Sequence, residues 1–284
     1  MTEKKKHYSV LMSVYHKEKP DFLRESMQSM YDQTVPTDDY VLVCDGPLTD
    51  ELDSVIAEMQ KKFGKRLNVL RQAKNHGLGY SLNLGVKECK NDLIASMDSD
   101  DVAVKTRCEK ELEVFESHPE LSVVGGYVGE FEKSVKDVKS VRKVPEKNAE
   151  IIEFAKGRNP FNHPTVMFKK KDVLKVGNYQ NIRFCQDYFL WVELLASGHK
   201  GYNIQEILVY MREDDNTFKR RSGKGYYVIQ KKLLQQMREK GFISRGQYIK
   251  SLSIRFCSSF APNWLRRTLF NSLMRSNNYG DINR

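Results

Sequence analysis

Residues 92–101 read Asp-Leu-Ile-Ala-Ser-Met-Asp-Ser-Asp-Asp, a short apolar run that ends in a quartet with three carboxylates. The run predicts a buried strand, because it is short and apolar and ends at polar residues. Neighbouring carboxylates repel one another unless they are solvated or bind a cation. Oxygen ligands alone favour Mg²⁺ or Mn²⁺ carrying a phosphorylated ligand. A solvated turn that caps the next helix explains the same quartet, so both interpretations stay open at this point.

Apolar runs and helical patterns alternate from residue 8 to about residue 117. The runs that predict strands are residues 8–15, 40–44, 67–70 and 92–97. The helical patterns between them begin near Pro20, at Thr49 or Asp50, and after Gly77 and Gly79. This alternation predicts an α/β fold with a mostly parallel sheet and helices on both faces.

The second half of the chain has a less regular pattern. Strands are predicted at residues 122–126, 165–168 and 207–211, and a helix at residues 187–196. The charged stretch 130–147 predicts an exposed excursion, and from residue 226 onward the pattern is helical and basic. We predict one domain over residues 1–220, with halves 1–117 and 118–220, and a basic helical extension over residues 221–284.

Polar or aromatic residues stand at the ends of three predicted strands. These residues are Tyr15, Asp45 and Asp98. In parallel sheets, ligands bind beyond the carboxyl ends of the strands. The three residues are therefore expected to meet at one rim, which favours a ligand site over a solvated turn.

The composition is that of a globular protein with an anionic partner. The chain has 284 residues, 40% hydrophobic and 30% charged, and a net charge of +10. The charge suits a phosphorylated substrate, a membrane surface or nucleic acid. Five cysteines with no C-x-x-C spacing indicate reduced thiols, and we see neither a signal peptide nor a run long enough to span a bilayer. We expect a cytoplasmic protein.

Further motifs accompany the acidic quartet in a fixed order. They are Cys44-Asp45-Gly46, Asn75-His76-Gly77, Asn83-Leu84-Gly85, Asn162-His163-Pro164 and Gln186-Asp187-Tyr188-Phe189-Leu190-Trp191. Over residues 8–215 this set resembles the family 2 glycosyltransferases with the GT-A fold, in the bacterial branch that builds capsule, exopolysaccharide and O-antigen units. The resemblance implies a Rossmann-like nucleotide-binding sheet and an inverting, metal-dependent transfer of one sugar. The donor would be a nucleotide sugar, a UDP-sugar above all, and the acceptor a lipid-linked glycan or oligosaccharide.

The same resemblance implies roles for individual residues. Those implied to bind the nucleotide sugar are Val14, Tyr15, Asp45, Lys74, Gly79, Asn83, Asp98 and Ser99. Asp100, with Asp101, would hold Mn²⁺ or Mg²⁺. Asp187 would be the catalytic base that takes the proton of the acceptor hydroxyl. An Asp at the start of a helical pattern is also a common cap, and the two roles are compatible.

Three more residues are candidates for contacts with the acceptor or the diphosphate. His163 is either a loop residue satisfied by backbone or a contact to a sugar. Arg212 and Arg220, the latter in the basic cluster 219–221, would stabilise the diphosphate or else belong to a solvated charge run.

The C-terminal segment 248–275 mixes aromatic and aliphatic residues with Lys and Arg. A basic amphipathic helix of this kind can lie on an anionic membrane surface. The alternatives are packing on the domain or self-association in an oligomer.

Two other function classes fit parts of the pattern. A sugar nucleotidyltransferase would carry a glycine-rich phosphate loop after the first strand, but residues 15–20 contain no glycine. The charge permits a non-enzymatic nucleotide-sugar binding module. No RNA-recognition signature is present, so we expect no nucleic-acid partner.

Overall fold

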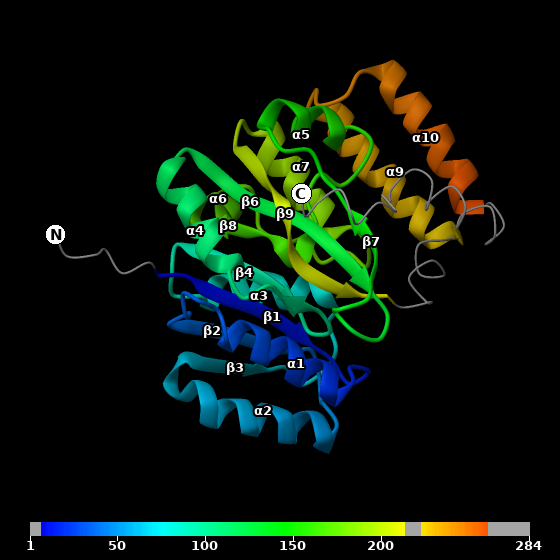
Figure 1. The fold of residues 1–284 in the computed structure, drawn as a ribbon. Helices are drawn as coiled ribbons and strands as arrows, with labels where there is room; N and C mark the ends of the chain where they lie inside the picture. Colours follow the sequence, from blue (N-terminus) through cyan, green and yellow to red (C-terminus); the bar gives the residue numbers. More distant parts are fainter. Residues whose placement is uncertain (1–6, 214–222, 261–284) are drawn as a thin grey trace.

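A computed structural model describes residues 7–213 and 223–260 (Figure 1). The strands are β1 (Ser9–Val14), β2 (Asp39–Cys44), β3 (Leu67–Arg71), β4 (Leu93–Asp98), β5 (Val102–Ala103), β6 (Leu121–Phe131), β7 (Val138–Arg142), β8 (Met167–Lys169) and β9 (Lys200–Arg212). The helices are α1 (Pro20–Tyr31), α2 (Asp50–Phe63), α3 (Leu78–Glu88), α4 (Arg107–Ser117), α5 (Asn148–Ala155), α6 (Lys170–Lys175), α7 (Gln186–Ala196), α9 (Gly223–Glu239) and α10 (Arg245–Phe260), with 3₁₀ turns η1 (Gly64–Arg66) and η2 (His163–Thr165).

One sheet runs through both halves of the chain in the order β3-β2-β1-β4-β8-β6-β9-β5, and β7 pairs with β6. The first four of these strands are parallel, as predicted. Their register pairs Val14 with Cys44 and Ser13 with Asp98, so β1, β2 and β4 end at the same edge. The predicted rim therefore forms.

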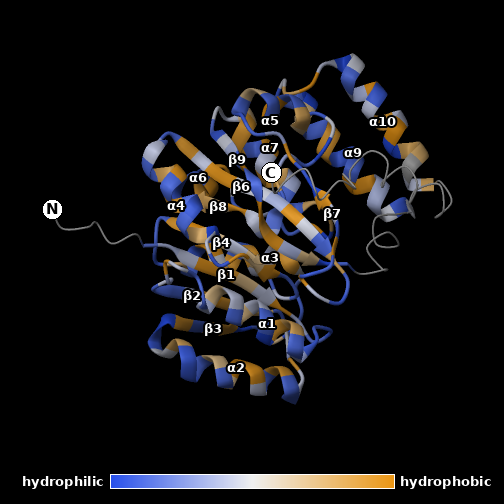
Figure 2. Ribbon diagram, in the orientation of Figure 1, coloured by the Kyte–Doolittle hydropathy of each residue, from blue (hydrophilic) through white to orange (hydrophobic). Residues whose placement is uncertain are grey.

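Helices cover both faces of this sheet because its strands alternate between two apolar cores. Met12 of β1 packs in one core with residues of α1, α2 and α4. Leu11, on the other face, packs with residues of α3, α5 and α7. In Figure 2 the strands carry much of the hydrophobic colour. The predicted starts of two helices are confirmed. Pro20 is the first residue of α1, and the Thr49 side chain caps α2 by accepting a hydrogen bond from the Leu52 N–H at 3.4 Å.

The second half of the sheet corrects two predictions. β8 is antiparallel to both β4 and β6, so the sheet is parallel only in part. The stretch 130–147 is exposed only in part. Residues 132–134, 136 and 137 at its tip are exposed, but β7 folds back on β6, and Glu130 and Val141 are fully buried. The Glu130 carboxylate is paired there with Arg142 at 2.8 Å and accepts the Ser140 hydroxyl, so its charge is compensated.

A buried ion pair lies where the parallel strands meet the antiparallel ones. Arg107 of α4 is fully buried and pairs with Glu111 at 3.2 Å. Its guanidinium donates to the carbonyls of Ser96 on β4 at 2.8 Å and of Val166, just before β8, at 3.2 Å. One side chain thus ties the two halves together.

The helices α9 and α10 lie at the end of the molecule opposite β3 and α2 (Figure 1). Leu233, Leu234 and Met237 of α9 pack against Tyr188 and Phe189 of α7. None of the helices in the described part of the chain combines the length and hydropathy needed to cross a bilayer. Arg220 and residues 261–284 lie outside the described residues, and the predicted domain division stays a prediction.

Candidate active site

The rim begins at the end of β1. Val14 is buried, and its carbonyl accepts the Asp45 N–H at 2.8 Å. Tyr15, the next residue, is exposed beyond the sheet edge, and its ring lies against His16 in an edge-on contact. The end of the strand therefore presents one fixed backbone position and one exposed aromatic ring.

Asp45 organises the loop between β3 and α3. Its two carboxylate oxygens accept the backbone N–H groups of His76 at 2.7 Å and Gly77 at 2.9 Å. Gly77 has φ +93° at the start of α3, a conformation that favours glycine. Each Asp45 oxygen keeps a second lone pair, so contact with a nucleotide base stays a prediction. Lys74 is exposed on the same loop.

Gly79 and Asn83 join α3 to the segment that precedes α7. A Cβ on Gly79 would lie 2.3 Å from the Gln180 carbonyl oxygen. The Asn83 side chain donates to the Tyr179 carbonyl at 2.7 Å, and Asn178 donates to the Asn83 carbonyl at 3.0 Å. Both predicted residues are thus engaged with protein, and their role near the ribose stays a prediction.

Residues of three other segments form hydrogen bonds with the acidic quartet and hold it at the rim. The Asp98 carbonyl accepts the Ser26 hydroxyl at 2.7 Å, and the Ser99 hydroxyl donates to Glu18 in the loop after β1. Asp101 is 1% exposed, and its Oδ1 accepts the Arg212 N–H at 3.0 Å.

Burial first, and then the charges of Asp100 and Asp98, raise the pKa of Asp101 well above its usual range. Its Oδ2 is buried with no hydrogen-bond partner among the described residues. The three carboxylates are therefore close enough to repel one another.

This donor set is suited to a divalent cation that also binds a diphosphate. Among residues 7–213 and 223–260, no three His, Cys, Asp or Glu side chains are arranged to hold a metal ion by themselves. Mg²⁺ sites in nucleotide enzymes use one or two carboxylates and take further ligands from phosphates and water. The Asp98 side chain is 36% exposed and Asp100 is partly exposed, so these two fit such a site better than Asp101.

Arg212, the last residue of β9, forms hydrogen bonds with the quartet. Its guanidinium lies between the rings of Phe22 and Phe131, 3.8 Å and 4.6 Å from their centroids, and pairs with Glu25 at 2.6 Å. Its Nε donates to the Asp100 carbonyl at 3.3 Å. Protein groups thus surround the guanidinium, and a contact with the diphosphate stays a prediction.

His163 lies just below the rim and is 10% exposed. Its Nδ1 is 3.4 Å from Asp98 Oδ1, and its Nε2 is 3.2 Å from the Tyr179 hydroxyl. Burial lowers the pKa of His163, but the Asp98 carboxylate, with a contribution from Asp187, outweighs it and raises the pKa above the usual value. The Asp98 carboxylate therefore favours the protonated form of the His163 ring, which lies against it.

Asp187 is the second residue of α7, and its Oδ2 accepts a hydrogen bond from Asn159 Nδ2 at 2.6 Å. Burial raises the pKa of Tyr179 well above its usual value, and the carboxylates of Asp187 and Asp98 add to this effect. Asp187 and Asp98 thus act on the same two side chains, Tyr179 and His163. The role of Asp187 as the base stays a prediction.

Sequence reasoning missed three residues of this site: Asn159, Tyr179 and Glu18. Asn159-Pro160 and Gly177-Asn178 are turn signals, so the sequence indicates loops at these points. It does not indicate which side chains the loops approach.

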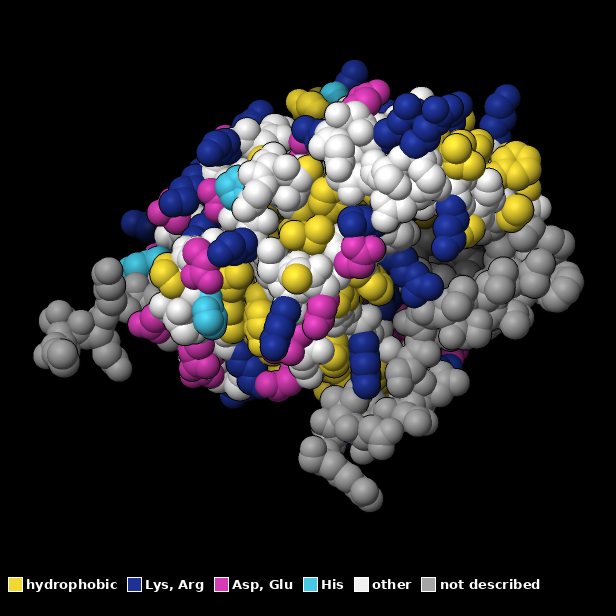
Figure 3. Space-filling model, turned by 90° about the horizontal axis from the view of Figure 1, so that it is seen from above, with side chains coloured by type: hydrophobic (Ala, Val, Ile, Leu, Met, Phe, Trp, Pro, Cys, Tyr) yellow, Lys and Arg dark blue, Asp and Glu magenta, His cyan; other side chains and the backbone are white. Residues whose placement is uncertain are grey.

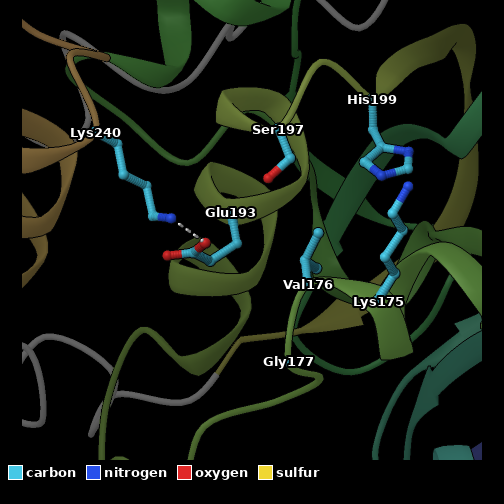
Figure 4. A pocket seen from close by; sticks show the side chains of 7 residues that line it. All are labelled: Lys175, Val176, Gly177, Glu193, Ser197, His199 and Lys240. Atoms are coloured by element: carbon cyan, nitrogen blue, oxygen red, sulfur yellow. Dashed lines mark ion pairs between the residues drawn. The ribbon is translucent and has the colours of Figure 1, made fainter.

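A hollow of ≈ 450 Å³ lies beside the C-terminal end of α7 (Figure 4). It is lined by Lys175, Val176, Gly177, Glu193, Ser197, His199 and Lys240. Ser197 follows the last residue of α7, about 15 Å along the chain direction from Asp187 at 1.5 Å per residue. Lys240 pairs there with Glu193 at 2.8 Å. The hollow is therefore separate from the predicted nucleotide site.

A family model described as "Glycosyl transferase family 2" matches residues 9–177 of this chain. Relatives also match this chain over most of their own length. The "UDP-Gal:alpha-D-GlcNAc-diphosphoundecaprenol beta-1,3-galactosyltransferase" of Escherichia coli is 36% identical over 275 residues, which cover 97% of this chain and 99% of the relative. The "Amylovoran biosynthesis glycosyltransferase AmsE" of Erwinia amylovora is 35% identical over 244 residues, which cover 85% of this chain and 90% of the relative.

The fold is also found in solved structures. The crystal structure of S. aureus TarS 1-349 in complex with UDP aligns with a TM-score of 0.62 and 16% identity, covering 96% of this chain and 77% of that chain. At this identity the likeness shows the GT-A fold alone. Because the family model and the relatives span most of the chain, the protein belongs to glycosyl transferase family 2 and is a transferase.

Proposed function

We propose that the protein transfers one sugar from a UDP-sugar to a lipid-linked acceptor in bacterial surface polysaccharide synthesis, with inversion at the anomeric carbon. The observation that carries this proposal is the position of the acidic quartet at the edge where β1, β2 and β4 end, with Asp98 Oδ1 3.4 Å from His163 Nδ1. The Asp187 carboxylate also contributes to the raised pKa of His163. The Escherichia coli relative, whose printed name gives UDP-Gal and a diphosphoundecaprenol acceptor, supports the choice of substrates.

The donor side of the proposed site consists of the rim and the quartet. Val14 and Tyr15 line the nucleotide pocket, Asp45 accepts from the base, and Asp100 with Asp98 holds Mn²⁺ or Mg²⁺. When bound, the cation neutralises the negative charge that develops on the departing diphosphate. Asp101 supports the quartet from its buried position and holds β9 through the Arg212 N–H.

The acceptor side of the proposed site is Asp187. Its carboxylate accepts the proton of the acceptor hydroxyl as that oxygen attacks the anomeric carbon. Asn159 holds one of its oxygens, which leaves the other for the substrate. A single displacement needs no covalent intermediate, and therefore it inverts the anomeric centre.

The proposal extends to an anionic membrane surface, where a lipid-linked acceptor would be met. Residues 223–260 contain eight Lys or Arg residues and one acidic residue, Glu239. The exposed side chains of α10 include Ile249, Ile254, Phe256 and Phe260. Figure 3 shows Lys and Arg side chains beside hydrophobic ones over this end of the molecule. Basic residues and exposed apolar side chains together favour interfacial binding.

Flotation with vesicles tests this extension. We expect the protein to float with phosphatidylglycerol vesicles and to stay behind with phosphatidylcholine vesicles. Ile254→Asp should weaken flotation, and Ile94→Val, a core change, should not. Equal recovery with both kinds of vesicle would contradict the extension while leaving the transferase proposal intact.

A panel of nucleotide sugars tests the transfer. Each is incubated with Mn²⁺ and GlcNAc α-diphosphate on a short alkyl chain, and UDP and the glycosylated product are measured. We expect product from one UDP-sugar, with inverted configuration by NMR. Release of pyrophosphate from UTP and a sugar phosphate, with no glycosyl transfer, would overturn the proposal.

A further inference from the structure

The C-terminal helix α10 contacts the surroundings of Asp187 at two points. Arg255 donates from Nη2 to the Gly157 carbonyl at 3.1 Å. Its guanidinium also lies 5.8 Å from the centroid of the Tyr188 ring. Gly157 precedes Asn159 by two residues, and Tyr188 directly follows Asp187. Arg255 thus touches both the loop that holds Asp187 and the helix that carries it.

The loop after α5 fixes the orientation of the Asn159 amide. Asn159 Oδ1 accepts the Phe161 N–H at 3.4 Å, while Nδ2 donates to Asp187 Oδ2 at 2.6 Å. With the oxygen used by backbone, the amide presents its N–H₂ group to the carboxylate.

The two ends of this loop are anchored to other elements. At one end, the Tyr188 hydroxyl donates to the Ala155 carbonyl at 2.7 Å. At the other end, Asn203 of β9 donates to the Pro160 carbonyl at 3.1 Å. Arg255 adds a third anchor between them, at Gly157.

Arg255 stands on the inner side of α10. Tyr248 and Leu252 of the same helix pack against the cluster that contains Phe189 and Val192 of α7. Lys250, in contrast, is exposed. The helix therefore reaches α7 through apolar packing and reaches the loop through one guanidinium.

We infer that Asn159 and Arg255 are positioning residues for Asp187, so that α10 is part of the acceptor side of the site. The inference rests on the proposed role of Asp187 as the base. Asn159 acts directly on the carboxylate, and Arg255 acts through the 157–159 segment. The titratable groups that interact with Asp187 are His163 on η2, Tyr179, and Tyr188 on α7.

The direct test is Asn159→Ala, assayed with UDP-galactose and GlcNAc α-diphosphate on an alkyl chain. Misplacement of a reacting group by about 1 Å can cost about 100-fold, so we expect kcat to fall by about 10- to 100-fold. The acid limb of the pH profile of kcat should move to higher pH, because a carboxylate that loses a hydrogen-bond donor is harder to ionise. UDP affinity should be unchanged. Asn159→Asp keeps the shape of the side chain and should move the acid limb further.

The indirect test compares Arg255→Ala, Arg255→Lys and the exposed control Lys250→Ala. Arg255→Ala should lower kcat and move the acid limb in the same direction as Asn159→Ala, but by less. It should also speed amide hydrogen exchange in residues 156–161. Arg255→Lys should restore part of both effects, and Lys250→Ala should show neither.

Asp187→Asn, measured alongside, separates the inference from the proposed function. An active Asp187→Asn variant would overturn the role of Asp187 and the inference with it. A different result would overturn the inference alone. In that case Asp187→Asn is inactive, but Asn159→Ala and Arg255→Ala keep the wild-type kcat and pH profile. Parallel loss of kcat, UDP affinity and melting temperature would assign Asn159 and Arg255 a merely structural role, which also contradicts it.

Discussion

The two sides of the proposed site, a donor side and an acceptor side, are built differently. On the donor side, Val14, Asp45 and the acidic quartet stand at the ends of parallel strands or directly beyond them, and the register of the sheet sets their spacing. On the acceptor side, Asn159 and Asp187 come from a loop and a helix start, and a side-chain hydrogen bond sets their spacing. Backbone ladders hold the first arrangement, and individual side chains hold the second.

This difference predicts different responses to mutation. A substitution on the acceptor side can displace the base while the sheet stays intact, so it should lower turnover more than donor affinity. A substitution on the donor side changes the carboxylates that meet the diphosphate, so it should act on donor binding first. Four experiments test the distinction.

The largest effect is expected for Asp187→Asn. An amide cannot take the proton of the acceptor hydroxyl, and general base catalysis contributes about 10²- to 10⁴-fold, so kcat should fall by that factor. UDP affinity, measured by calorimetry with Mn²⁺, should not change. Asp92→Asn, an exposed change away from the rim, is the matched control. A parallel fall in UDP affinity would mean that the two sides are not separate.

Asp100→Asn should weaken UDP binding in the presence of Mn²⁺. Altering the surroundings of a metal ion commonly costs about 10- to 100-fold in affinity, and we expect a loss of at least that size. Binding without metal should change little. Asp101→Asn provides the contrast, because Asp101 is buried against the Arg212 N–H and should leave the Mn²⁺ dependence in place. Equal effects of the two variants would place both carboxylates on the ion.

Gly79→Ala should loosen the join between α3 and the 178–181 segment. The added Cβ would meet the Gln180 carbonyl oxygen at 2.3 Å, and overpacking of this kind costs about 1–3 kcal/mol of the free energy of unfolding. Gly225→Ala in α9 meets nothing within 4 Å and should instead stabilise by about 0.5–1 kcal/mol. Urea denaturation of both variants checks the prediction. An unchanged free energy of unfolding for Gly79→Ala would contradict the close approach of Gly79 to the Gln180 carbonyl.

The smallest effect is expected for His163→Gln, and it depends on pH. Because the folded-state pKa of His163 is raised, its ionic contribution to stability is complete below about pH 6.5 and is lost as the pH rises through the folded-state value. The wild-type protein should therefore exceed the variant in free energy of unfolding by more at about pH 5.5 than at about pH 9. Burial also raises the pKa of Glu111, to about 8, but both proteins share that group. A difference in free energy of unfolding that grows toward high pH would contradict the raised pKa of His163.

The first half of the fold could be predicted from the sequence because each strand there is a mostly apolar run that alternates with a helical pattern. Pro20 and Thr49 mark the helix starts that follow β1 and β2. In the second half, the strands predicted at residues 122–126, 165–168 and 207–211 and the helix at 187–196 fall on β6, β8, β9 and α7. The direction of β8 could not be predicted, since it has only three residues and nothing local fixes it. The burial of the hairpin of β6 and β7 could not be predicted, because a charged stretch is usually exposed to solvent. Here Glu130 and Arg142 compensate each other's charge across the two strands.

The site divides in the same way. Asp45 and Asp98 follow from their positions at strand ends. Asp187 followed only from the family motif around it. Asn159 could not be predicted, because its contact with Asp187 joins residues 28 positions apart, with β8 and α6 between them. Short-range signals mark where a loop lies, and long-range packing decides what it touches.

The bridge made by Arg107 has a consequence for substrate choice. Its guanidinium binds the strand that carries Asp98 and the segment that follows His163, so the parallel and antiparallel parts of the sheet form one frame at this point. We therefore expect specificity for sugars and acceptors to depend on the connecting loops at residues 72–77, 157–162 and 178–185. Efforts to redirect the enzyme to a new glycan should exchange those loops and leave the frame unchanged.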